Sequence, residues 1–483
     1  MASIRLPLFG SIESRDYKSF FDGVTADSAI KYDQGGTDVQ YDIITDNVNG
    51  KKVGYFYPRE NFATSGVPAA AGAGTAIHAW VGSSNAIVSA FGDTNSTIYR
   101  AAVSQGAITG QAAFINEGSL SDVANLFIVN ATGANGYFGT GGGSLTEITA
   151  TWFPPKQTPA LTTTGQFVQF NGYTHIMATN GQVWCADLNA INTGTQGSAR
   201  YVTAQQKADP GIGIARYQNS IVAFGSASAE FFFHAGNATN SPLSPEANYI
   251  NLGCANQYAY CNIGDTVAFF STNEGYGIYI LEGRQAKKIS TPPIDRILAG
   301  STASAVRLNK FSSQGRMFLL VTAPVSPFQL AYDMQGGTWE LWGFTGNQVT
   351  QSDVVLNSST SSTVYAGPSF TSYYTTSATG KTGTFLTGKF DAGTNNRKFI
   401  NSVSVISAMG STSSTNVSVS WSDDDYETFS TPITLSVNAS ERPQRVRSGS
   451  FVTRAFKVSG ANDNAGRILR CAALEIDYDV GSW

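Results

Sequence analysis

Short apolar segments separated by turn residues recur through the middle of the chain. In the clearest unit, two Asn-Gly turns join three such segments, at residues 166–170, 175–178 and 183–185. Asn-Gly is a strong local signal for a β-hairpin, because both residues tolerate the positive φ angles of a type I′ turn. The pattern therefore predicts an antiparallel meander of three strands.

Similar units begin near residues 77, 126, 166, 221, 267, 317 and 364. Their starts lie roughly 40 to 50 residues apart, the period of a four-stranded β-propeller blade. A small sheet cannot bury its faces alone, whereas a ring of sheets buries each face against a neighbour. We predict an all-β protein whose residues 66–388 form a β-propeller of about six blades, within a range of about five to seven.

Aromatic residues within the repeats are predicted to fill the space between blades. Phe231, Phe232 and Phe233 are consecutive in a strand-like segment, and neighbouring strand residues face opposite sides of a sheet. Both sides of a blade are buried, so all three are predicted to belong to the core, with a partner-binding site as the alternative. Trp339 and Trp342 follow a pair of glycines and are predicted to wedge between blades.

The two ends of the chain differ from the repeats. Residues 389–483 contain longer strand-like segments with alternating apolar and polar positions, which is typical of a β-sandwich. Residues 1–65 contain a few strand-like segments, and we interpret them as an N-terminal arm. We predict that this arm pairs with the C-terminal domain and completes its sandwich-like platform.

Composition supports the all-β class and limits the function. Aromatic residues make up 12% of the chain and glycine is used 50 times, as in strands joined by tight turns. Charged residues are only 13% and the formal net charge is −4, so a polybasic surface for sequence-specific nucleic-acid binding is not expected. Weak acidity is compatible with a conduit through which DNA slides without being held. No apolar run is long enough for a signal sequence or a membrane span.

The residues that usually carry chemistry are few and scattered. The four cysteines lack metal-ligand spacing and are predicted to be reduced, buried thiols: Cys185, Cys254, Cys261 and Cys471. The three histidines stand alone in apolar segments and are predicted to be hydrogen-bonded structural residues: His78, His175 and His234. Neither a nucleophile elbow nor a phosphate-binding glycine loop occurs. We predict no enzymatic activity, no catalytic residue, no cofactor and no metal site.

Residues 422–429 resemble the Asp-box turn of sialidases and other propeller proteins. The matching residues are Ser422, Asp424, Thr428 and Phe429. In such a turn the carboxylate accepts hydrogen bonds from backbone amides, so the match implies a structural role and no activity. The three adjacent carboxylates at 423–425 leave calcium open as an alternative. We prefer a solvated turn, because nothing in the sequence places further oxygen ligands.

The segment from residue 216 to 298 contains an ordered set of motif residues: Phe224, Gly225, Glu230, Gly236, Asn237, Gly253, Cys254, Gly264, Asp265, Gly283, Ile289, Ser290 and Thr291. In this order the segment resembles the packaged-DNA stabilisation proteins, or tail hub proteins, of short-tailed bacteriophages (podoviruses). Residues 421–424 and 454–457 are similar to the C-terminal end of the same family.

The resemblance implies a structural virion protein, assembled in the host cytoplasm and located in the tail. It implies a homo-oligomeric ring, most simply a hexamer, below the portal complex and the tail adaptor protein. This tail hub or nozzle would retain packaged DNA, pass it through its lumen during ejection, and offer docking surfaces for fibre, spike or needle proteins, without membrane insertion. The alternative is a carbohydrate-binding or sialidase-like β-propeller that acts on host glycans.

Overall fold

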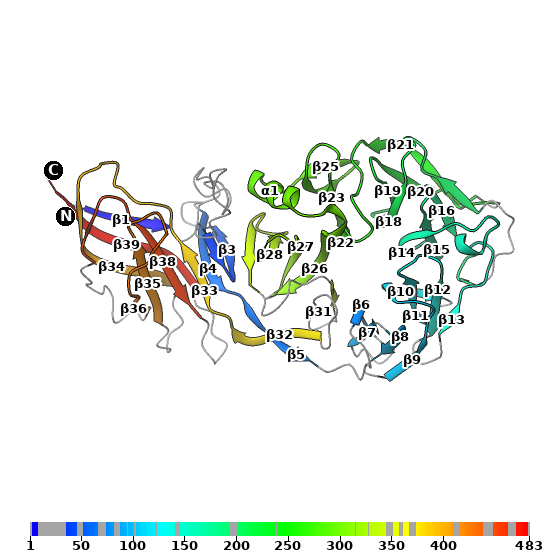
Figure 1. The fold of residues 1–483 in the computed structure, drawn as a ribbon, viewed down its shortest axis with the longest axis horizontal. Coiled ribbons are helices and arrows are strands. Elements are labelled where there is room, and N and C mark those ends of the chain that lie inside the picture. The colour runs from blue at the N-terminus through cyan, green and yellow to red at the C-terminus, as the bar shows by residue number, and fades with distance from the viewer. Residues whose placement is uncertain are drawn as a thin grey trace.

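The computed structural model shows a ring of small sheets joined to a second β-structure (Figure 1). It describes residues 2–7, 35–45, 52–65, 74–81, 87–93, 95–100, 103–120, 123–140, 145–192, 200–237, 239–313, 315–326, 328–343, 351–356, 361–366, 373–408, 416–437, 448–461 and 470–481. The segment at 66–73, where the predicted arm and propeller meet, lies outside the described residues.

Antiparallel four-stranded units, here named blades 1 to 7, form the ring. Blade 1 contains β6 (Gly74–Val81), β7 (Ile87–Asp93), β8 (Thr97–Arg100) and β9 (Val103–Ala107). Blade 2 contains β10 (Ala112–Leu120), β11 (Val123–Asn130), β12 (Gly136–Thr140) and β13 (Thr146–Glu147). Blade 3 contains β14 (Thr163–Phe170), β15 (Tyr173–Ala178), β16 (Gln182–Cys185) and β17 (Tyr201–Thr203). Blade 4 contains β18 (Gly211–Tyr217), β19 (Ser220–Gly225), β20 (Ala229–His234) and β21 (Leu243–Ile250).

The remaining blades complete the ring. Blade 5 contains β22 (Tyr260–Ile263), β23 (Thr266–Ser271), β24 (Gly277–Glu282) and β25 (Gln285–Lys288). Blade 6 contains β26 (Arg307–Ser313), β27 (Arg316–Thr322), β28 (Gln329–Asp333) and β29 (Trp339–Trp342). Blade 7 contains β30 (Gln351–Leu356), β31 (Ser361–Ala366), β32 (Tyr373–Gly380) and β5 (Glu60–Ser65). The predicted β-propeller is confirmed, and its seven blades are one more than the central prediction.

The first strands of the blades form a closed cycle. In order, β6, β10, β14, β18, β22, β26 and β30 each contact the next strand, and β30 contacts β6. Each blade is therefore covered on both faces by its neighbours, which is how a ring of small sheets buries its apolar residues.

Blade 7 takes its outer strand from the N-terminal side of the chain. β5 pairs with β32 in a register that runs from Tyr373↔Ser65 to Gly380↔Glu60. The assignment of residues 60–65 to an arm that pairs with the C-terminal domain is therefore wrong. Because β5 precedes blade 1 and completes blade 7, its hydrogen bonds tie the two ends of the ring together.

The β-sandwich confirms the second part of the predicted fold class. One sheet contains β3 (Val39–Thr45), β4 (Lys52–Pro58), β39 (Arg470–Val480), β34 (Lys398–Ala408) and β37 (Ser450–Phe451), with β1 (Ala2–Pro7) paired to β39. The other contains β33 (Gly383–Leu386), β38 (Ala455–Gly460), β35 (Asn416–Ser422) and β36 (Ile433–Ser436). Val403, Val419, Phe456 and Leu474 are fully buried in the core they share. The division at residues 388 and 389 stays a prediction.

A single nine-stranded sheet joins the propeller to the sandwich. β2 (Gly35–Thr37) lies between β29 of blade 6 and β33 of the sandwich, parallel to the first and antiparallel to the second. The sandwich is thus held by backbone hydrogen bonds, not by a linker alone.

Buried charges reinforce this joint between propeller and sandwich. Arg59 is 1% exposed, and its Nε donates to Asp38 Oδ1 at 2.7 Å. Its Nη2 donates to the carbonyl oxygen of Gly343 at 2.6 Å, and its guanidinium lies 5.4 Å from the ring centroid of Trp342. Lys381 also pairs with Asp38, at 3.2 Å. Segments from blade 6, β2, β4 and the β32–β33 connection therefore meet at one ion-pair network.

The helical content of the described chain is small. Helix α1 (Pro292–Gly300) links blades 5 and 6, with η2 (Pro154–Lys156) and η3 (Ala303–Ala305) as single turns elsewhere. Prolines at the first positions of α1 suit the φ angle of a helix start, and Ile294 and Leu298 are fully buried. None of the described helices is long and apolar enough to cross a membrane.

The aromatic predictions are mostly confirmed. Phe231 and Phe232 are fully buried, and Trp339 and Trp342 are 2% and 0% exposed. Trp339 Nε1 donates to the carbonyl oxygen of Ile289, so this indole does lie between blades 5 and 6. Phe233 is 42% exposed, and its prediction as a core residue is wrong.

Candidate functional site

Several residues of the resemblance form turns on blades 4 and 5. Gly264 and Asp265 connect β22 to β23, and Gly283 connects β24 to β25. Gly264 and Gly283 have positive φ angles of 55° and 62°, which glycine adopts without strain. Asn237, beside Gly236 after β20, donates from Nδ2 to the carbonyl oxygen of Ser241 at 3.0 Å. In the structure these residues shape loops and do not converge on one site.

A second group of these residues builds the crossing from blade 4 to blade 5. Phe224 is fully buried and its ring lies 5.1 Å from that of Phe269 in blade 5. The Cys254 amide donates to the carbonyl oxygen of Gly225 at 3.0 Å. A Cβ on Gly225 would overlap the carboxylate of Asp209. The absence of a side chain at Gly225 therefore leaves room for this carboxylate.

Gly253, in the same crossing, is crowded by backbone atoms. A Cβ there would overlap backbone atoms of Ser226, Ala227 and Gly225, which cannot rotate away as a side chain could. We expect Gly253→Ala to lower the free energy of unfolding by about 1–3 kcal/mol. Gly388→Ala is the matched control, because a Cβ at Gly388 meets nothing within 4 Å. Chemical unfolding of both variants tests this, and equal stability would contradict it.

The polar residues of the motif block are held in structural roles. Glu230 is 3% exposed and accepts hydrogen bonds from the amides of Gln206 at 2.7 Å and Gln205 at 3.2 Å. Burial raises the pKa of Glu230, and those hydrogen bonds oppose the shift. Burial raises the pKa of the Cys254 thiol to about 12, so this thiol is not a nucleophile at neutral pH.

The last residues of the motif block fasten helix α1. Ser290 Oγ donates to Asp295 Oδ1 at 2.6 Å and accepts from the amide of Ile278 at 3.0 Å. Ile289 also donates its amide to the carbonyl oxygen of Ile278, and Thr291 directly precedes the helix. These contacts tie α1 to β24.

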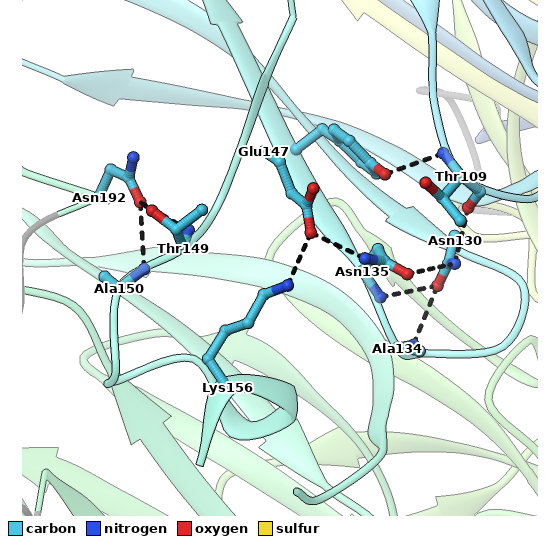
Figure 2. Close-up of polar contacts among 10 residues, drawn as sticks. Thr109, Asn130, Ala134, Asn135, Glu147, Thr149, Ala150, Lys156 and Asn192 are labelled. Carbon is cyan, nitrogen blue, oxygen red and sulfur yellow. Dashed lines mark hydrogen bonds and ion pairs between the residues drawn. The ribbon is translucent and has the colours of Figure 1, made fainter.

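Blade 2 carries a polar network that locks the turn before β12 (Figure 2). Asn130 Oδ1 accepts from the amides of Ala134 and Asn135 at 3.0 and 3.1 Å. Asn135 Nδ2 and Lys156 Nζ both donate to Glu147 Oε1, at 2.8 and 2.7 Å. The hydrogen bond from Lys156 is the main reason why the pKa of Glu147 is lowered. All these polar groups satisfy one another, so the network is structural.

The Asp-box-like turn forms between β35 and β36. Asp424 Oδ1 accepts from Ser422 Oγ at 2.7 Å and from the Thr428 amide at 2.9 Å. The Thr428 hydroxyl donates to the same carboxylate. This hydrogen bond, followed by those from the Thr428 amide and the Ser422 hydroxyl, lowers the pKa of Asp424 to about 2. Phe429 packs on the small cluster formed by Leu386, Tyr426 and Ala455.

The carboxylates beside Asp424 have partners of their own. Asp423 receives two hydrogen bonds from the nearly buried Arg454, at 2.6 and 2.7 Å, and Asp425 pairs with Lys389. The three carboxylates thus serve three different partners and do not converge on a cation. In the described part of the chain, no group of three or more His, Cys, Asp or Glu residues is placed to hold a metal ion.

His175 lies between blades 3 and 4, and the hydrogen bonding of its side chain differs from the prediction. The side chain is fully buried, but neither ring nitrogen has a hydrogen-bond partner in the described structure, so its prediction as hydrogen-bonded is wrong. Burial, with smaller contributions from His234 and Arg200, lowers the pKa of His175 to about 3. His175 is therefore neutral at physiological pH.

The axis of the propeller holds a cavity of about 580 Å³. It is lined by the first strands of six blades and by the segment before β22. Phe114 of blade 2 stacks on Tyr258, with ring centroids 4.9 Å apart. The guanidinium of Arg307, in blade 6, lies 4.1 Å from the Tyr258 centroid. Blades 2 and 6 are not neighbours in the ring, so this stack crosses the axis.

The stack and the small volume exclude duplex DNA from the propeller axis. One base-pair step of a duplex, about 3.4 Å high and about 20 Å across, occupies on the order of 1,000 Å³.

The residues of this stack could not be predicted from the sequence, because Phe114, Tyr258 and Arg307 are far apart in the chain and belong to no local motif.

Fold and contacts together define a β-propeller scaffold whose blade 6 shares a sheet with a β-sandwich. The family model described as Bacteriophage P22 Gp10, beta-propeller, matches residues 79–389. The chain therefore belongs to this phage stabilisation family and is a bacteriophage structural protein.

Comparisons with other proteins give only distant similarities. No curated protein matches the chain. BamB from Moraxella catarrhalis is 9% identical with a TM-score of 0.38, over 78% of this chain and 97% of that one. BBS1N, solved in complex with ARL6DN, is 11% identical with a TM-score of 0.39, over 66% of this chain and 97% of that one.

Proposed function

We propose that this chain is the tail hub or nozzle subunit of a short-tailed bacteriophage. Copies of it form a homohexameric ring below the portal and the tail adaptor protein, retain the packaged DNA, and enclose the path of DNA ejection. The observation that carries the proposal is membership of the P22 Gp10 family over residues 79–389. The residues of the earlier resemblance, from Phe224 to Thr291, lie inside this span.

In this proposal the DNA passes between subunits and not through a propeller. The Phe114–Tyr258–Arg307 stack supports this arrangement, because it crosses the axis of the propeller. The weak net charge of −4 also supports it, since a polyanion moves most freely past walls that do not bind it.

The rigid joint supports a role in ring formation. A cyclic ring is built from head-to-tail interfaces, and closure requires a fixed angle between the two surfaces of each subunit. The shared sheet through β2 and the buried Arg59–Asp38 pair hold the sandwich at one orientation to the propeller. One interface on the propeller and one on the sandwich would therefore keep the fixed angle that ring closure requires.

The alternative of a glycan-acting propeller has less support. Its main sequence feature, the turn at 422–429, belongs to the sandwich, and its carboxylates are used inside the protein. Glycan binding is therefore best kept as an outcome of the test.

Electron microscopy of the purified chain with the portal and adaptor proteins of its virion tests the proposal. We expect closed rings with sixfold symmetry, attached to the connector, with a lumen at least as wide as a duplex, about 20 Å. The chain alone serves as the control for connector-dependent assembly. Single propeller-sized particles that ignore the connector, combined with specific binding on a glycan array, would overturn the proposal in favour of the alternative.

A further inference from the structure

The axial cavity is positively charged inside an acidic protein. Among the residues that the structure describes, its charged lining consists of three basic side chains, Arg216, Arg307 and Lys310, and one acidic side chain, Glu117. This described lining has an excess of two positive charges, whereas the whole chain has a formal net charge of −4. Such a local reversal of sign favours an anion in the cavity.

Arg307 is held in position for binding such an anion. Its guanidinium is half-buried and stacked on Tyr258 at 4.1 Å, and Tyr258 in turn stacks on Phe114. Stacking uses the face of the guanidinium and leaves its N–H groups at the edge, where they match two oxygens of one oxyanion. Burial lowers the pKa of Arg307, and no carboxylate contributes to the shift. Among the described residues, no acidic side chain neutralises this guanidinium.

The size of the cavity agrees with a small ligand. Its volume of about 580 Å³ lies within the range of small-molecule sites, about 300–1,000 Å³. The cavity lining also includes aromatic and apolar residues, among them Phe114 and Tyr258. These residues can contact an organic group attached to the anion.

We propose that the axial cavity binds a phosphate dianion, either free or as the monoester of a small organic molecule, with Arg307 as its bidentate anchor. Phosphate monoesters carry about −1.5 to −2 charges at neutral pH, which matches the excess of positive charge. Arg216, on the same cavity lining, supplies further positive charge. The site is separate from tail assembly, and its test does not depend on ring formation.

Isothermal titration calorimetry of the full chain tests the site with sodium phosphate, glucose 6-phosphate and adenosine monophosphate. At least one probe is expected to bind saturably, with a dissociation constant of about 1 mM or tighter. Arg307→Gln should weaken that binding by about tenfold to a hundredfold, the loss expected for charged hydrogen bonds. Arg307→Lys keeps the positive charge but lacks the planar guanidinium. Its dissociation constant should lie between those of the parent chain and Arg307→Gln. Lys287→Gln, on the exposed strand β25 of blade 5, is the matched control and should bind as the parent chain does.

The probes distinguish the two sources of the anion. Tightest binding of sodium phosphate supports a site for the free ion, and tighter binding of a monoester supports a site for an organic phosphate. The proposal is overturned if no probe binds at about 10 mM, or if Arg307→Gln binds as tightly as the parent chain. If Arg307→Gln does not fold, Arg216→Gln replaces it, because Arg216 is exposed; unchanged binding by that variant would equally overturn the proposal.

Discussion

Arg59→Ala is expected to lower the free energy of unfolding by about 3–5 kcal/mol. The guanidinium of Arg59 is 1% exposed and makes its ion pair with Asp38 at 2.7 Å. Removing it leaves the buried Asp38 carboxylate with Lys381 as its remaining ion-pair partner, and leaves the Gly343 carbonyl without the 2.6 Å hydrogen bond from Arg59. An incompletely compensated buried charge is among the most destabilising results of a single substitution.

Urea unfolding of the variant and the parent chain measures this loss. Lys287→Ala is the matched control, because the ion pair of Lys287 with Glu282 lies on the surface, with side chains 59% and 55% exposed. Such pairs contribute about 0–1 kcal/mol. A loss for Arg59→Ala no larger than that of the control would show that the joint does not depend on this ion pair.

Acidification is expected to destabilise the protein through His175. Its pKa is about 3 in the folded state, against about 6.5 when exposed. Between these values the unfolded chain binds a proton that the folded chain excludes, so stability falls as the pH falls. The contribution is about 1.4 kcal/mol per pH unit below about pH 6.5, or about 2 kcal/mol between pH 7 and pH 5.

Comparison of the parent chain with His175→Leu isolates this contribution. Leucine has a similar volume and does not titrate, and its side chain suits a site where, in the described part of the chain, neither imidazole nitrogen has a hydrogen-bond partner. Unfolding free energies of both proteins are measured at about pH 5, 6 and 7. The difference between the two proteins should change most at low pH and approach a constant value as the pH rises. Parallel pH profiles would show that His175 does not carry the acid sensitivity.

These two predictions concern different parts of the chain. Arg59 lies at the joint between propeller and sandwich, whereas His175 lies between blades 3 and 4. If the proposed ring forms, a variant at the joint should therefore impair its assembly under conditions in which the propeller stays folded. A variant at His175 should alter the stability of the propeller first.

The candidate site could be predicted only in part. The motif residues were found because the resemblance rests on a local order of residues, and Gly264 and Gly283 lie in turns whose geometry depends on their own φ angles. The Asp-box-like turn was recognisable for the same reason, since Asp424 bonds residues only two and four positions away. The stack of Phe114, Tyr258 and Arg307 has no local signature, because its members meet only after the ring closes.

The sequence by itself determined the strands, the hairpins and the propeller class, because alternating apolar positions and Asn-Gly turns act over a few residues. Only the tertiary structure decided which strand completes blade 7, and that β2 joins blade 6 to the sandwich. Every exposed strand edge offers the same backbone donors and acceptors, so local sequence does not choose between them. That choice depends on which edge the folded ring and sandwich bring within hydrogen-bonding distance.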